Sequence, residues 1–331
     1  MTAYVIQRIL LTLPVILLAV TLVFLAGHAV PDYAVRQIAQ GLTGAENFEE
    51  AKQQVRHDLG LDKPLLTQYV QYVGGLFKGD LGDSYITKKP VLEELKLRMP
   101  VSAELGLLTV LVALPLAVIF GVISAIRQDT WLDYVVRFLS ILGLAIPSFY
   151  LGVLLLIFVF KGFDWAPPLT TTGYRNLLPP PLGASGLEVD PVQNLKQMAL
   201  PAIAGGLALS AGMMRLLRSQ MLEVLRQDFV RTAWAKGLRE RTIIFRHILK
   251  NAMIPVFTFA GLEVGILFSG EIVLEWMFSL PGMGIYTVMA IKQSDFPAAQ
   301  GIVLVVATAL VATNLLVDLT YGWLDPRVRY Q

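Results

Sequence analysis

Six long apolar stretches constrain the fold of this chain more than any other feature of its sequence. A helix that crosses a bilayer needs roughly 20 mostly apolar residues, because its backbone polar groups find no water there and must pair within the helix. The stretches that meet this requirement are Ile9–Val30, Ala103–Ile126, Phe138–Phe160, Ala199–Leu217, Ala252–Leu274 and Ala298–Trp323. The sequence therefore predicts an all-α integral membrane protein with six transmembrane helices.

The composition supports this class and excludes others. Only 16% of the 331 residues are charged, whereas soluble domains average about 25%. The net charge of +2 argues against a nucleic-acid-binding protein, which needs a concentrated basic face. The chain has no cysteine, which excludes disulfides, thiolate zinc sites and cysteine nucleophiles.

The distribution of Lys and Arg predicts the orientation in the membrane. The segment from Arg215 to Lys250 carries nine Lys and Arg residues against three acids, and the loop Ser279–Pro297 carries only Lys292. Short cytoplasmic loops are enriched in positive residues. We therefore expect residues 215–250 and both termini to be cytoplasmic.

Residues 31–100 are predicted to form a small extracytoplasmic element between the first two spans. Helical periodicity covers Ala45–Leu59 and Leu65–Phe77, and Gly79–Asp83 has the composition of a turn. Because so small a unit has little core of its own, we expect it to pack on the membrane domain or on a partner. The expected divisions of the chain are an N-terminal transmembrane helix over 1–30, this element over 31–100, a membrane core over 101–323 and a cytoplasmic tail over 324–331.

No catalytic motif is visible. The chain has no glycine-rich phosphate loop ending in Gly-Lys-Ser/Thr, so it is not expected to bind or hydrolyse ATP by itself. Its three histidines are scattered, and the absence of His-Glu-x-x-His excludes a helical zinc protease. We therefore expect a protein that is not an enzyme and holds no metal.

Glu263, midway along the fifth predicted span, is the strongest candidate for a functional group within the membrane. An ionisable side chain at a helix centre costs roughly 2.5–3.5 kcal/mol on insertion scales, so one that is retained is a functional candidate. Glu263 either lines a polar pathway or pairs within the bundle, for example with Asn314 or a backbone amide.

The cytoplasmic segment carries the most informative pattern. Residues 226–237 have the pattern of a short amphipathic helix ended by glycine, and a basic amphipathic helix then runs into the fifth span. Phe229, Ala233, Trp234 and Gly237 fall at helical spacing and give a face of small and aromatic residues. A basic helix lying on anionic lipid would present apolar bulk instead, so the pattern favours a helix that docks on another protein.

This segment resembles the EAA loop of the permeases of ATP-binding-cassette (ABC) importers. In register, Arg231-Thr232-Ala233 takes the place of Glu-Ala-Ala, and Gly237 that of the glycine. The form Arg-Thr-Ala-x-Ala-Lys-Gly is typical of the dipeptide and oligopeptide subfamily. The usual Ile-x-Leu-Pro ending is altered, because the proline is delayed to Pro255.

Five further motifs resemble the same subfamily. They are His57–Pro64, Gly79–Gly82, Ile146–Phe149, Leu280–Gly284 and Leu324–Tyr330. The chain is thus similar, over nearly its whole length, to the first or B-type permease of peptide importers.

The resemblance implies a type I ABC importer permease fold over about 101–323, with the coupling loop over 218–251. It also implies a second homologous permease, two P-loop ATPase subunits that carry ATP and Mg, and an extracytoplasmic solute-binding protein, all at the plasma (inner) membrane of a prokaryote. This chain itself would bind no cofactor. The residues implied to dock on the ATPase are Phe229, Arg231, Thr232, Ala233, Ala235, Lys236 and Gly237.

Short peptides are the substrate that the resemblance implies first, although related systems carry nickel complexes, glutathione or oligosaccharides. On the residues alone, two other classes stay open. A secondary transporter would use Glu263 or Asp318 as a proton site, but no paired repeats typical of such carriers are visible. A membrane scaffold would bind another protein through residues 31–100, but it would not require the basic, small-faced cytoplasmic segment.

If Glu263 lines the pathway, Glu263→Gln is expected to lower substrate uptake without changing the amount of assembled complex, because glutamine keeps the shape and removes the charge. Uptake by whole cells, with the complex quantified by immunoblot, measures both quantities. Unchanged uptake at normal assembly would exclude the pathway role.

Overall fold

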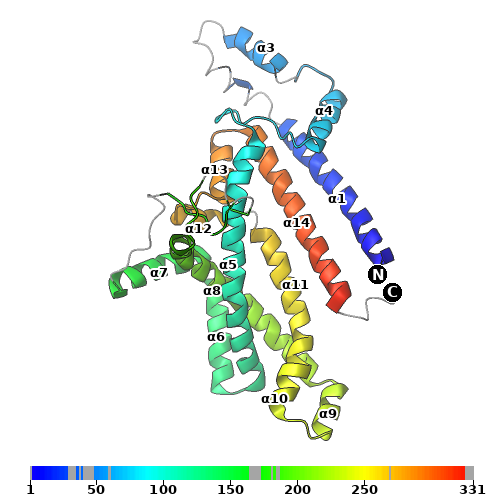
Figure 1. The fold of residues 1–331 in the computed structure, drawn as a ribbon, viewed down its shortest axis with the longest axis vertical. Coiled ribbons are helices and arrows are strands. Elements are labelled where there is room, and N and C mark those ends of the chain that lie inside the picture. The colour runs from blue at the N-terminus through cyan, green and yellow to red at the C-terminus, as the bar shows by residue number, and fades with distance from the viewer. Residues whose placement is uncertain are drawn as a thin grey trace.

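The computed structural model describes residues 2–28, 35–36, 39, 48–58, 61–163, 173–179, 182–183, 187–267 and 270–324. Over these residues the regular structure is helical, and the two β-bridges, Asp83 with Pro90 and Asn176 with Val189, are isolated pairs. Figure 1 shows an elongated bundle with α9 (Asp228–Ala235) and α10 (Glu240–Thr242) at one end. The predicted all-α class is confirmed.

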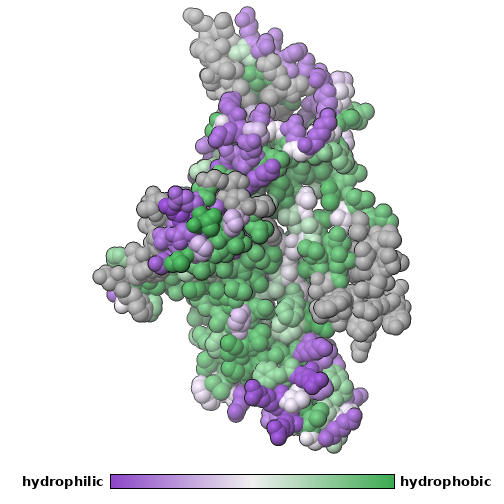
Figure 2. Space-filling view, viewed as in Figure 1, coloured by the Kyte–Doolittle hydropathy of each residue, from purple (hydrophilic) through white to green (hydrophobic). Residues whose placement is uncertain are grey.

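Within the described part of the chain, five helices are long and apolar enough to cross a membrane. They are α1 (Thr2–His28), α5 (Val91–Ile126), α8 (Pro191–Leu225), α11 (Leu249–Leu267) with the helical turns before it, and α14 (Phe296–Leu324). The pair α6 (Trp131–Ala145) and α7 (Ser148–Phe163) makes a sixth crossing when counted as one. On the face shown in Figure 2, hydrophobic side chains form a broad band between two polar ends.

The third predicted span, Phe138–Phe160, is not one straight helix, and the prediction is wrong there. The chain bends by 105° between α6 and α7. At the bend Ile146 has an extended backbone, with φ −93° and ψ 120°. Pro147 supplies the reason, because its ring disfavours the helical conformation of the residue before it and because it has no N–H to donate.

The fifth predicted span, Ala252–Leu274, ends early. Helix α11 stops at Leu267, Gly270 has a positive φ of 85°, and a separate short helix, α12 (Ile272–Met277), follows. A Cβ on Gly270 would lie 2.5 Å from the backbone nitrogen of Gly284. Only glycine can therefore combine this positive φ with so close a contact.

The second span begins earlier than predicted. Helix α5 starts at Val91 rather than near Ala103, so Pro100 lies inside the helix. Glu93 and Glu94 occupy its first turn, where the positive end of the helix dipole favours negative charge. The last residues assigned to the outer element are thus the first turns of a membrane helix.

Helices α5 and α8 make the most extensive helix–helix interface of the described chain. Glycines bring the two backbones close: a Cβ on Gly206 would lie 2.6 Å from Val112 Cγ1, and one on Gly121 would lie 3.1 Å from Leu217 Cδ2. In a membrane, lipid tails remove the hydrophobic attraction between helices, so close van der Waals packing of this kind holds them together.

The outer element contains the two predicted helices, observed as α3 (Phe48–Asp58) and α4 (Leu65–Phe77). Helix α4 lies against α1. The hydroxyl groups of Tyr69 and Thr21 are 2.8 Å apart, and the Tyr69 ring meets the Phe24 ring edge-on with centroids 5.2 Å apart.

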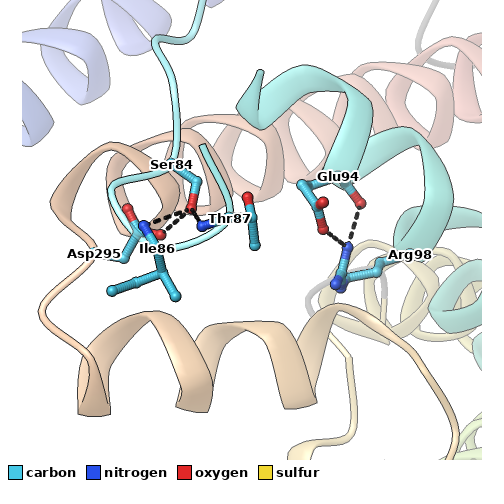
Figure 3. A network of polar contacts seen from close by, with 6 residues as sticks. All are labelled: Ser84, Ile86, Thr87, Glu94, Arg98 and Asp295. Atoms are coloured by element: carbon cyan, nitrogen blue, oxygen red, sulfur yellow. Dashed lines mark hydrogen bonds and ion pairs between the residues drawn. The ribbon is translucent and has the colours of Figure 1, made fainter. Parts of the chain in front are cut away.

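A second attachment ties the turn after α4 to the start of α14. Ser84 donates a hydrogen bond to Asp295, close to an ion pair between Arg98 and Glu94 of α5 (Figure 3). The backbone N–H of Tyr85 donates a hydrogen bond of 3.1 Å to the Asp295 carboxylate. The pKa of the Tyr85 hydroxyl is raised to about 12, mainly because the side chain is buried and also because the negative charge of Asp295 is near. The expected packing of the outer element on the membrane domain is confirmed for these residues.

An ion pair joins α6 to α8 at the end of the bundle that carries α9. Asp133 is fully buried and accepts hydrogen bonds of 2.8 Å from both Nε and Nη2 of Arg218. Ser124, near the end of α5, and the backbone N–H of Asp129 donate to the same carboxylate. Because a bidentate pair is stronger and more directional than a single contact, it holds α5, α6 and α8 together here.

Asp133→Asn is expected to destabilise the folded chain by about 3 kcal/mol, because Arg218 loses the partner of its partly buried charge. The midpoint of thermal unfolding in detergent, followed by tryptophan fluorescence, measures the change. Asp129→Asn is the matched control, since the Asp129 side chain is exposed and the residue contributes a backbone hydrogen bond. Equal midpoints for the two variants would contradict a stabilising role of the pair.

Candidate functional site

Helix α9 lies where the sequence predicts a docking helix, and apolar packing holds it against the bundle. Its Val230 and Ala233 are buried in one cluster with Ile243, Ile244 and Ile248. These isoleucines belong to η3 (Ile243–Ile248), a π-helical turn that follows α10. Helix α9 is therefore packed against the rest of the chain on one side and does not project freely.

Gly237 ends α9 as the sequence predicts. Its φ is +71°, its N–H donates to the carbonyl of Trp234 at 2.9 Å, and the N–H of Leu238 donates to the carbonyl of Ala233 at 3.4 Å. A left-handed residue with such reversed hydrogen bonds is a common glycine ending of a helix. No described atom lies within 4 Å of a Cβ built on Gly237, so the backbone, and not crowding, requires glycine.

Most residues predicted to dock on the ATPase are exposed on the outer side of α9 and the turn after it. They are Phe229, Arg231, Thr232, Ala235, Lys236 and Gly237. Ala233 differs, because it is buried beneath the helix. Trp234 is 49% exposed and Phe229 is 40% exposed, so two aromatic rings reach the surface of α9. Aromatic side chains are enriched where proteins bind one another, so this face has the composition of an interface.

The basic amphipathic helix predicted after Gly237 is formed by α10, η3 and the start of α11. Its isoleucines are buried, while Arg241, Arg246 and Lys250 are exposed. Turns of π-helix within α-helices occur frequently at functional sites. Here the helical backbone continues through the turn into α11, so the isoleucines that pack under α9 belong to the same continuous helical segment as a membrane helix.

Glu263 lies half-buried on the side of α11 that faces away from α14. Gly261 and Gly265 pack against α14 and stand two residues before and after it, so at 3.6 residues per turn Glu263 is on the opposite face. Among the described residues no hydrogen bond joins Glu263 to Asn314, whose buried Oδ1 has no partner. The pairing of these two side chains is not found.

Glu271 is an acid that the sequence pattern did not single out, although it falls within the fifth predicted span. It directly follows Gly270 at the break after α11 and accepts a hydrogen bond of 3.4 Å from Ser148 at the start of α7. Its carboxylate is close enough to Glu263 for the two charges to interact. Its position within an apolar stretch was the signal available in the sequence.

Glu275 explains the glycines of the Leu280–Gly284 motif. Its buried carboxylate accepts a hydrogen bond from Ser102 at 2.5 Å and from two backbone N–H groups at the start of α13 (Met283–Lys292) at 2.7 and 3.2 Å. A Cβ on Gly282 would lie 2.5 Å from this carboxylate. The motif is therefore a cradle of N–H groups at a helix start, where an anion is favoured, and it ties α12 and α13 to α5.

Three parts of the predicted pattern lie outside the described residues. They are the side chain of Asp318, residues 59–60 of the first motif, and residues 325–331 at the C-terminus. Their roles stay predictions.

Two family models match the chain. Residues 1–106 match the family described as "Binding-prot-dependent transport system membrane comp, N-term". Residues 117–330 match the family described as "Binding-protein-dependent transport system inner membrane component". The second match contains α9, η3 and the acidic residues described above.

Individual relatives are similar over all or most of their length. The dipeptide transport system permease protein DppB of Alkalihalophilus pseudofirmus is 36% identical, with 100% of both chains covered. DppB of Escherichia coli K12 is also 36% identical over 100% of both chains. The protein named "Probable D,D-dipeptide transport system permease protein DdpB" of the same strain is 38% identical over 92% of this chain and 91% of its own.

Gly237→Val is expected to lower the stimulation of ATP hydrolysis in the assembled transporter several-fold. A β-branched residue is strained at a φ of +71° and also adds bulk to the docking face. The ATPase activity of the purified complex measures the effect. Gly237→Asn is the matched control, because asparagine tolerates the left-handed conformation, and it should keep most of the stimulation. Full stimulation in the valine variant would count against a coupling role for this turn.

Proposed function

This chain belongs to the binding-protein-dependent transport permeases, as the membrane-spanning subunit of an ABC importer, and from that premise we propose that its cargo is short peptides. The support is its similarity, over the full length, to dipeptide permeases from two bacteria. We expect the transported peptides to be dipeptides and oligopeptides.

The observation that carries the proposed mechanism is α9, an exposed helix on a rigid backing in a chain with no phosphate-binding loop. An importer driven by ATP needs a surface through which a separate ATPase can move the permease. We place α9 in a groove of that ATPase, with Phe229, Arg231 and Trp234 at the contact. Ala233 acts from beneath, by holding the helix in position.

The proposed partners are a second homologous permease, two P-loop ATPase subunits and an extracytoplasmic solute-binding protein. ATP and Mg are bound by the ATPase subunits, and this chain binds no cofactor and catalyses no reaction. The family description, which makes transport dependent on a binding protein, supports this assembly.

In the proposed orientation, α9 and both termini are on the cytoplasmic side of the plasma (inner) membrane of a prokaryote. The Lys and Arg residues between 215 and 250 support it. So does Figure 1, where the N-terminal end of α1 and the C-terminal end of α14 both point toward the end of the bundle that carries α9. The outer element then faces the binding protein.

Transport in this scheme couples nucleotide binding to the opening of the pathway. ATP binding closes the ATPase pair and draws the docking helices together, and α9 moves η3 and α11 with it. The ion pair of Asp133 with Arg218 makes α6 follow α8. The pathway opens outward as the binding protein releases its peptide, and hydrolysis resets it. Each step requires a ligand that binds one conformation more tightly than the other.

Deletion of this chain is expected to abolish uptake of radiolabelled alanyl-alanine, and the gene supplied on a plasmid should restore it. Affinity purification of the tagged chain in mild detergent, followed by mass spectrometry, should recover the second permease and one or two P-loop ATPases. Uptake that survives deletion would exclude this cargo, and nickel complexes, glutathione and oligosaccharides would be tested next. Recovery of the chain alone, when other ABC complexes stay intact, would contradict the proposed partners.

A further inference from the structure

Helix α4 of the outer element carries a row of large apolar side chains that the described chain leaves uncovered. Leu66, Val70 and Phe77 are 74%, 62% and 89% exposed. At 3.6 residues per turn, the three positions lie within about 40° of one another around the helix. Gly74 lies beside them, and a Cβ built on it would meet no described atom within 4 Å. One side of α4 is therefore apolar and open.

An adjacent side of α4 packs on α1. The hydroxyl groups of Tyr69 and Thr21 lie 2.8 Å apart. The rings of Tyr69 and Tyr72 both contact the ring of Phe24, with centroids 5.2 and 5.6 Å away. Figure 1 shows α4 beside the end of α1 that is remote from the N-terminus. One hydrogen bond and two aromatic contacts thus fix where α4 meets α1.

These contacts also set the depth of α4 in the membrane. The apolar span of α1 is Leu10–His28, so Thr21 and Phe24 stand seven and four residues before its end. At 1.5 Å per residue, they lie about 10 and 6 Å inside that end. At the same depth α1 exposes Leu22 and Leu25, as a helix in contact with lipid does. Helix α4 therefore lies at the boundary between headgroups and acyl chains, and not in the water above it.

The distribution of charge in the outer element agrees with this depth. None of the 13 residues of α4 is charged, and Lys63 and Lys78 flank the helix. In α3, by contrast, 5 of 11 residues are Asp, Glu, Lys or Arg. Charged side chains are costly in hydrocarbon, whereas lysines at the end of a helix can extend to the headgroups. The composition of α4, unlike that of α3, is that of a helix at the surface of a membrane.

We propose that α4 is a lipid-binding helix, whose Leu66, Val70 and Phe77 insert among the phospholipids around the C-terminal end of α1. In the orientation proposed above, this is the outer leaflet. Helices of this kind bury their apolar face about 5–10 Å into the boundary between headgroups and acyl chains, which matches the depth of the contacts with α1. Bound lipid would hold the outer element to the membrane surface, in addition to the attachment of Ser84 to Asp295.

The test attaches one bimane fluorophore to a single cysteine of this chain, in the assembled transporter reconstituted in proteoliposomes. The chain has no native cysteine, so the complex without an introduced cysteine gives the background from its partner subunits. Val70→Cys and Phe77→Cys place the dye in the apolar row. Gln71→Cys is the matched control, because position 71 is also exposed but lies about 100° around the helix from Val70. All these positions are exposed, so the variants should fold.

Two quenchers report what surrounds the dye. One is a phospholipid with a nitroxide on the upper part of its acyl chain, and the other is iodide in the water. At positions 70 and 77 the lipid nitroxide is expected to remove about half of the fluorescence and iodide little of it. At position 71 iodide should quench about threefold more strongly than at position 70. ATP hydrolysis by each labelled complex confirms that it is assembled.

Three results would overturn the lipid-binding role. Equally strong iodide quenching at all three positions would place α4 in water. Protection of positions 70 and 77 from both quenchers would assign the apolar row to a protein partner within the complex. Iodide quenching at these positions that disappears when the solute-binding protein is added would assign the row to that protein. None of these readouts depends on the cargo, so a failure of the proposed peptide substrate would leave this test unaffected.

Discussion

The close packing of α5 against α8 is the contact on which the rest of the structure depends. In lipid no hydrophobic force draws helices together, so the two backbones must fit one another, and the glycines at 121, 205 and 206 allow that fit. Polar contacts then attach the other elements to this pair. Asp133 and Arg218 hold α6 at one end, and Glu275 holds α12 and α13 to α5 toward the other.

The scarcity of water inside a membrane also governs how the polar groups within the bundle are paired. Most are satisfied, as the Asp133 and Glu275 carboxylates are, because an unpaired polar group in a membrane is costly. Five buried side-chain atoms of the described residues have no hydrogen-bond partner: Glu104 Oε1, Thr109 Oγ1, Asn194 Oδ1, Tyr286 Oη and Asn314 Oδ1. The Glu271 carboxylate accepts one long hydrogen bond, from Ser148. Helix α9 differs from these groups, because it packs on an apolar cluster and still exposes most of its outer side chains.

Some features of the fold can be predicted from residues that are neighbours in the sequence, and others cannot. Hydropathy located the membrane helices, since burial in lipid depends only on about 20 neighbouring residues. The glycine at 237 predicted the end of α9, because a positive φ is a local property. The bend at Pro147 was also readable from local rules, but a continuous apolar run from Phe138 to Phe160 outweighed it. The break at Gly270 was less visible, because it depends on the contact of that glycine with the backbone of Gly284.

By itself, the sequence determined the membrane class, the apolar segments, the short amphipathic helix α9 and the absence of an ATP-binding loop. Each of these follows from residue types within one segment of the chain, which for a membrane span is about 20 residues long. Only the tertiary structure decided that Ala233 lies beneath α9, that Glu263 turns away from Asn314, and that Thr109 and Glu271 both pack beside Gly205. These relations join residues that are far apart in the chain. They depend on how one helix packs on another, and no local pattern of residues encodes that packing.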